Sequence, residues 1–96
     1  MTSSIDVVIS PFATRNLENI LDYTERQWGT GQREAYHRVL EAAFGRIGTY
    51  PDIGKPAEGG PPNTRELVLK HHTILYLREP DRVTILRILS HRRMRT

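Results

Sequence analysis

The sequence predicts an α+β domain in which one strand and two helices precede three further strands, in the order β-α-α-β-β-β. Apolar residues in the first half of the chain recur with the 3.6-residue period of a helix, whereas from Arg65 onward they alternate with the two-residue period of a strand. A stretch rich in Pro and Gly separates these halves. We therefore expect an antiparallel helix hairpin packed on one face of a mostly antiparallel sheet.

The first half begins with a short strand that leads into two helices. Residues 5–9 (IDVVI) are β-branched and too few for a helix, and Ser10-Pro11 then supplies an N-cap and a first-turn proline. The first helix runs to the break at residues 29–31 (GTG), and the second covers residues 32–49. The two apolar stripes consist of Ala13, Leu17, Ile20, Leu21, Thr24 and Trp28, and of Tyr36, Val39, Leu40, Ala43, Phe44 and Ile47.

The second half consists of a long loop and three strands. Residues 51–63 contain four Pro and three Gly, which excludes regular structure there and predicts a loop near the upper length limit for a compact domain. Strands follow at residues 65–70, 73–78 and 83–90, with a turn at residues 79–82 whose second position is proline.

Length and composition exclude several classes of protein. The 96 residues fit one domain, predicted to span residues 1–96. The absence of cysteine excludes a disulfide framework, thiol catalysis and Cys-based zinc sites. No apolar run reaches the roughly 18 residues of a membrane span, and no secretory signal begins the chain. We therefore expect a cytoplasmic protein that does not enter a membrane.

Positive charge is concentrated in the last third of the chain. Residues 65–96 carry eight basic and three acidic residues, although the whole chain has a net charge of only +3. Most of the basic residues are arginine, which favours planar, bidentate contact with carboxylates or phosphates. The partner is therefore expected to be acidic, either a nucleic acid or an acidic protein segment.

The last predicted strand is apolar on both faces. Strict alternation places Val83, Ile85 and Leu89 on one face and Leu86 and Ile88 on the other. Because a helix hairpin covers only one face, we expect the other face to pack on a second chain or to form a groove.

Three side chains near this strand are candidates for binding. Arg87 and His91 share the odd-numbered face, and Arg65 at the start of the preceding meander can approach the same surface. Such a cluster with an apolar floor suits an acidic amphipathic peptide or a phosphate backbone. An equally favoured interpretation of Arg87 is a single salt-bridged strand residue.

Candidates for catalysis and metal binding are few. A histidine side chain ordinarily changes its charge near neutral pH, so His91, in a basic neighbourhood, is a possible general acid or base, although a lone histidine is more commonly not catalytic. The tail with Arg92, Arg93 and Arg95 either binds phosphates or is solvated, and solvation is the commoner outcome. Consecutive histidines at residues 71–72 point to opposite faces of a strand, and no Gly-rich phosphate loop is present. We expect neither a metal nor a cofactor.

A series of residues along nearly the whole chain matches a known family in order and spacing. These residues are Ser10-Pro11, Asn16-Leu17, Ile20, Tyr23, Trp28-Gly29, Tyr36, Tyr50-Pro51, Ile53-Gly54, Arg65-Glu66-Leu67, Tyr76, Ile85-Leu86-Arg87-Ile88-Leu89 and His91-Arg92-Arg93-Met94. Together they resemble the ParE branch of the RelE/ParE toxin superfamily. The resemblance implies a bacterial type II toxin–antitoxin system, the RelE/ParE-like fold, and an antitoxin whose C-terminal segment wraps the toxin.

The resemblance implies one of two activities. RelE-like members are ribosome-dependent messenger RNA endonucleases that use basic side chains and a C-terminal Tyr or His, and here Arg65, Arg87 and His91 match or approach those positions. ParE-like members poison DNA gyrase and have no catalytic site, and the ending at residues 90–94 (SHRRM) is closer to theirs.

The sequence-based hypothesis is accordingly a ParE-like toxin that inhibits DNA gyrase, is not an enzyme, and is neutralised by a cognate antitoxin. The residues expected to contact the antitoxin or the target are Arg65, Arg87, His91, Arg92, Arg93 and Arg95. One alternative is a RelE-type endonuclease acting on ribosome-bound messenger RNA, with Arg65 and Arg87 holding the phosphate and His91 as acid or base. Another is a small non-toxic nucleic-acid-binding protein.

Overall fold

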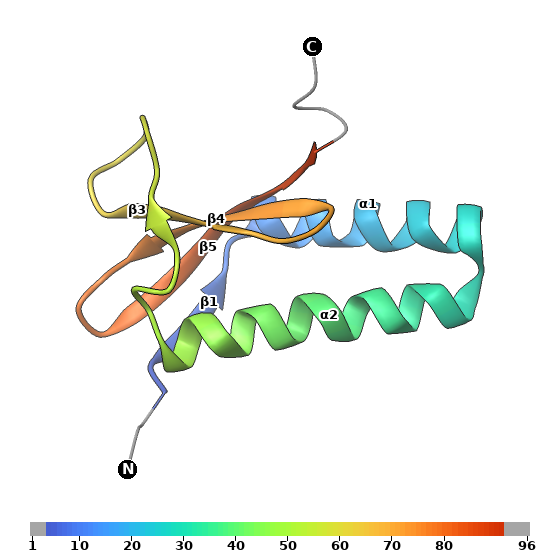
Figure 1. Cartoon of the computed structure of the whole chain (residues 1–96), viewed down its shortest axis with the longest axis horizontal. Coiled ribbons are helices and arrows are strands. Elements are labelled where there is room, and N and C mark those ends of the chain that lie inside the picture. The colour runs from blue at the N-terminus through green and yellow to red at the C-terminus, as the bar shows by residue number, and fades with distance from the viewer. Residues whose placement is uncertain (1–3, 92–96) are drawn as a thin grey trace.

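The computed structural model describes residues 4–91 and confirms the predicted α+β class and order of elements. Figure 1 shows a long helix hairpin lying beside a twisted sheet. The elements are β1 (Asp6–Ile9), α1 (Pro11–Trp28), α2 (Thr30–Thr49), β2 (Lys55–Pro56), β3 (Thr64–Val68), β4 (His72–Arg78) and β5 (Arg82–Ser90).

The sheet has the strand order β1-β5-β4-β3-β2. β1 pairs with β5 in parallel and all other pairs are antiparallel, so the sheet is mostly antiparallel as predicted. The prediction that residues 51–63 lack regular structure is wrong at Lys55 and Pro56, which pair with Glu66 and Arg65. Proline is tolerated here because an edge strand forms hydrogen bonds on one side only.

The helix hairpin turns at a single residue. The Ser10 side chain accepts a hydrogen bond from the Ala13 N–H at 3.1 Å and begins α1, as its position before Pro11 predicts. Only Gly29, with φ +92°, separates the helices, so the predicted three-residue break is wrong and α2 begins two residues earlier, at Thr30. A positive φ reverses the chain direction without further residues. Neither helix in the described range is both long and apolar enough to cross a membrane.

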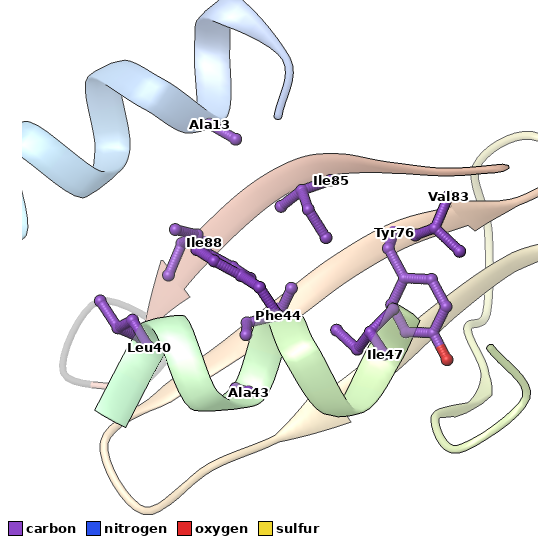
Figure 2. Packing of buried hydrophobic residues seen from close by; sticks show 10 residues of the cluster. Ala13, Leu40, Ala43, Phe44, Ile47, Tyr76, Val83, Ile85 and Ile88 are labelled. Atoms are coloured by element: carbon purple, nitrogen blue, oxygen red, sulfur yellow. The ribbon is translucent and has the colours of Figure 1, made fainter. Parts of the chain in front are cut away.

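The core lies between the hairpin and one face of the sheet. Figure 2 shows Phe44 and Ile47 of α2 pointing toward the sheet. The buried cluster consists of Ala13, Leu40, Ala43, Phe44, Ile47, Ile74, Tyr76, Val83, Ile85 and Ile88. Two members of the predicted stripes are largely exposed, Trp28 at 72% and Val39 at 49%. Trp28 stays in solvent because the turn of the hairpin projects beyond the sheet (Figure 1).

Helix α1 also protects an edge of the sheet. β1 pairs with β5 only as far as Ile85. Beyond that point the Ser10 hydroxyl donates to the Leu86 carbonyl at 3.1 Å, and the Asn16 side-chain oxygen accepts from the Ile88 N–H at 3.0 Å. These side chains satisfy backbone groups that an open edge would expose.

Candidate functional site

A bulge in β5 decides which side chains reach each face of the sheet. Arg87 pairs with Leu75 and Ile85 pairs with Tyr76, and because Leu75 and Tyr76 are adjacent, Leu86 has no residue opposite it. One extra residue shifts the alternation of side chains by one position. Residues after the bulge therefore point to the face opposite to the one that strict alternation predicts.

The predicted division of the last strand is wrong for this reason. Ile88 is 4% exposed and lies in the core with Val83 and Ile85, although alternation places it on the other face. Arg87 and Leu89 point away from the core because they pair with Leu75 and Thr73. The expected second apolar face exists, and it keeps Leu89 and Arg87 together with apolar side chains of β3 and β4.

We call the sheet face away from the hairpin the outer face. According to the strand register, side chains of three strands point to the outer face. They are Glu66 and Val68 of β3, Thr73 and leucines of β4, and a leucine of β5. Its apolar side chains are Val68, Leu75, Leu77 and Leu89, all partly or largely exposed, with Val68 at 55%. Apolar side chains that share one face and keep contact with solvent are typical of a surface that a partner covers.

Arg87 lies on the outer face beside α1. Its guanidinium carbon is 4.7 Å from the centroid of the Phe12 ring, and the residue Phe12 is 51% exposed. No carboxylate of residues 4–91 forms an ion pair with Arg87. The sequence-based reasoning missed Phe12, although an aromatic residue outside the apolar stripe of a helix is a signal that can be read without a structure.

Arg65 occupies the opposite face of the sheet. It pairs with Tyr76, whereas Arg87 pairs with Leu75, so the expectation that both arginines share one surface is wrong. Arg65 Nη1 donates to the carbonyls of Gly54 at 2.5 Å and Asp52 at 3.3 Å, and Nε lies 3.5 Å from an Asp52 carboxylate oxygen. Arg65 thus holds the segment that follows α2.

Beside Arg65 lies an open hollow of about 510 Å³, lined by residues 56–57, 59–64, Asp52 and Arg78. The Asp52 carboxylate also accepts from Arg78 Nε at 3.1 Å. Both arginines that border the hollow therefore share one acidic partner, which offsets part of their charge.

Three of the histidines, His71, His72 and His91, lie near one another at the other end of the sheet. The Tyr36 hydroxyl lies 2.5 Å from His72 Nδ1, and His91 Nε2 lies 2.9 Å from the Thr73 hydroxyl. Burial, with repulsion from His91 and His71, lowers the pKa of His72 to about 4, and burial raises the pKa of Tyr36 to about 12. At neutral pH the Tyr36 hydroxyl therefore donates to a neutral imidazole and ties α2 to β4.

Of the remaining predicted site residues, His91 has a described position and the three arginines of the tail do not. His91 follows Arg87 by four residues, or about 13 Å of extended strand. Arg92, Arg93 and Arg95 lie outside the described residues. Within residues 4–91, no three His, Asp or Glu side chains are grouped so that they could hold a metal ion.

The fold is similar to that of chains in two solved toxin–antitoxin structures. The chromosomal ParDE toxin–antitoxin system from P. aeruginosa contains a chain that superposes with a TM-score of 0.77 at 16% identity, over 91% of this chain and 96% of that one. The RelBE2 toxin–antitoxin complex from Mycobacterium tuberculosis gives a TM-score of 0.69 at 22% identity, over 92% and 99%. At these identities the likeness shows the fold alone.

Sequence similarity identifies the family. Residues 7–95 match the family described as the ParE toxin of the type II toxin–antitoxin system parDE. Toxin ParE1 of Mycobacterium tuberculosis (strain CDC 1551 / Oshkosh) is 35% identical over 88 residues, covering 91% of this chain and 89% of that protein. Toxin ParE1 of Caulobacter vibrioides is 34% identical over 81 residues, covering 84% and 83%. The chain belongs to the ParE toxin family, which confirms the resemblance seen in its sequence.

Proposed function

We propose that this ParE-family toxin inhibits DNA gyrase in the bacterial cytoplasm without catalysing a reaction of its own, and that a cognate antitoxin neutralises it by covering the outer face. The proposal rests on family membership together with one geometric observation, which is the separation of Arg65 from Arg87.

That separation favours a non-enzymatic toxin over a RelE-type endonuclease. Stabilising the phosphate of a cleavage transition state requires cationic side chains that converge on one point. Arg65 and Arg87 pair with adjacent residues of β4, which point to opposite faces, and Arg65 already donates to two backbone carbonyls. Of the three residues that the endonuclease hypothesis names, Arg87 and His91 lie on the side of the outer face. Their backbones are separated by four residues, or about 13 Å of extended strand.

The antitoxin is proposed from the outer face and from the relatives. A domain of this size buries only about 60 to 65% of the surface of its unfolded chain, so a partner that covers an apolar face adds needed burial. Leu75, Leu77 and Leu89 are only partly buried and form the floor for such a partner. Both structural relatives come from toxin–antitoxin complexes.

Purified protein tests the proposed target directly. We expect inhibition of supercoiling by DNA gyrase, intact messenger RNA on ribosomes, and recovery of supercoiling when an equimolar amount of antitoxin is added. The antitoxin probe is the product of a short open reading frame adjacent to the toxin gene, and its omission is the control.

Two results would replace the proposal. Cleavage of ribosome-bound messenger RNA that is lost in both Arg65→Gln and Arg87→Gln would establish the endonuclease. Binding to duplex DNA that weakens steeply with salt, with active gyrase and intact messenger RNA, would establish a non-toxic nucleic-acid-binding protein.

A further inference from the structure

Arg87 lies on the outer face, and no carboxylate of the described residues offsets its charge. Lys55 and Glu66 form a pair at 3.3 Å at the opposite edge of the sheet, and Arg82 pairs with Glu79 at 3.1 Å. Arg87 is exposed and has no carboxylate partner within residues 4–91. A positive charge therefore remains where β5 meets α1.

The backbone around Arg87 is fixed on both sides. The carbonyl of Leu86 accepts from the Ser10 hydroxyl at 3.1 Å, and the N–H of Ile88 donates to the Asn16 side chain at 3.0 Å. Ser10 is the N-cap of α1 and Asn16 lies in the second turn of this helix, so Phe12 lies between them in sequence. The same segment of helix thus positions the backbone of Arg87 and the ring that its side chain covers.

The central carbon of the Arg87 guanidinium lies over the Phe12 ring, 4.7 Å from its centroid. The N–H donors lie along the edge of the planar group, and no carboxylate of residues 4–91 forms an ion pair with them. A carboxylate binds that edge through two parallel hydrogen bonds. The side chain is already ordered by Phe12, so less conformational entropy is lost on binding.

We propose that Arg87 and Phe12 form a preorganised anchor for a carboxylate side chain of the antitoxin, and that aliphatic residues next to this carboxylate pack on Leu75 and Leu89. The partner is an acidic amphipathic protein segment, because the anchor combines one unpaired cation with an apolar floor. This inference rests on the proposed antitoxin and adds the position at which its acidic residue binds.

Titration of the antitoxin against toxin variants tests the anchor. We expect Arg87→Gln to weaken binding at least about tenfold, and Arg87→Lys to recover little of the loss, since lysine provides the charge but neither the planar edge nor the same stacking. Phe12→Leu should weaken binding less, and the loss caused by Arg87→Gln should be smaller in the Phe12→Leu background. Arg38→Gln is the matched control, because Arg38 is an exposed arginine on α2.

Thermal midpoints that match the wild type show that the variants are folded, so a change in antitoxin binding then reports on the contact itself. If the wild-type toxin does not bind the antitoxin, the proposed function fails. If the wild type binds and Arg87→Gln or Arg87→Lys binds within twofold of it, the anchor is wrong while the proposed function stands. If Arg87→Gln abolishes binding to duplex DNA and leaves antitoxin binding unchanged, Arg87 is a nucleic-acid contact and the anchor is likewise overturned.

Discussion

The hydroxyl group of Tyr76 accepts a hydrogen bond from the backbone N–H of Gly54 at 2.8 Å and donates to the Pro51 carbonyl at 2.8 Å. Tyr76 is fully buried in β4, so a single core side chain holds the segment that leads from α2 into β2. A Cβ atom on residue 54 would lie 2.8 Å from this hydroxyl and 2.7 Å from the Glu66 carbonyl oxygen. The segment and the core therefore depend on each other.

Gly54→Ala should lower the free energy of unfolding by about 2 to 3 kcal/mol, because the added methyl group overlaps backbone and a buried ring that cannot move aside. Gly45→Ala is the control, since a Cβ there meets no atom within 4 Å and alanine favours the helix by up to about 1 kcal/mol. Urea unfolding of both variants checks the prediction, and equal stabilities would contradict it.

Tyr76→Phe should lower the free energy of unfolding by about 2 kcal/mol. The change leaves the Gly54 N–H and the Pro51 carbonyl without their partner while the ring still fills the core. Tyr50→Phe removes a hydroxyl from a side chain that is 58% exposed and should change stability by less than about 0.5 kcal/mol. A similar effect of the two substitutions would show that the buried hydroxyl is not important.

Arg65→Gln should destabilise the protein by about 1 to 2 kcal/mol, whereas Arg87→Gln should have an effect below about 0.5 kcal/mol. Arg65 donates to the carbonyls of Gly54 and Asp52, whereas the exposed Arg87 side chain lies over the Phe12 ring and forms no ion pair within residues 4–91. Thermal unfolding compares the two variants. The reverse order of stabilities would assign the structural role to Arg87 instead.

His72 should make the protein less stable in mild acid. Its pKa is about 4 in the folded state and 6.5 ordinarily, so between these values the unfolded chain binds more protons and stability falls as the pH falls. The loss from pH 7 to pH 5 should be about 1 kcal/mol after allowance for partial exposure.

The variant His72→Asn isolates this contribution. An asparagine side chain offers an oxygen to the Tyr36 hydroxyl and does not titrate, so the variant should lose less stability than the wild type over the same pH range. The other three histidines are present in both proteins, so the difference between the two pH profiles reports the titration of His72 together with its coupling to His71 and His91. Parallel pH profiles of stability would contradict the assignment to His72.

Local signals predicted most of the fold. Ser10-Pro11 marks the start of α1, and the change of period near Arg65 marks the passage from helices to strands. These features depend on residues close in sequence, because capping and amphipathic periodicity act over one or two turns. The family could be recognised for the same reason, since its characteristic residues follow the elements in order.

The candidate site could be predicted only in part. The apolar last strand indicates Arg87, but its neighbour Phe12 is 75 positions earlier in the chain and meets it through packing of α1 beside β5. The sequence also predicts Arg65 on the same surface, but the register with Tyr76 turns it away. Neither relationship follows from spacing along the chain.

The sequence by itself determined the class of fold, the order of its elements, the basic last third and the membership of the ParE toxin family. The tertiary structure decided which face each side chain of β5 reaches, because the bulge at Leu86 depends on pairing with β4 rather than on the pattern within the strand. It likewise separated Arg65 from Arg87 and brought Phe12 to Arg87. Local periodicity determines helices and strands, whereas register and packing between distant segments determine the surface that a partner meets.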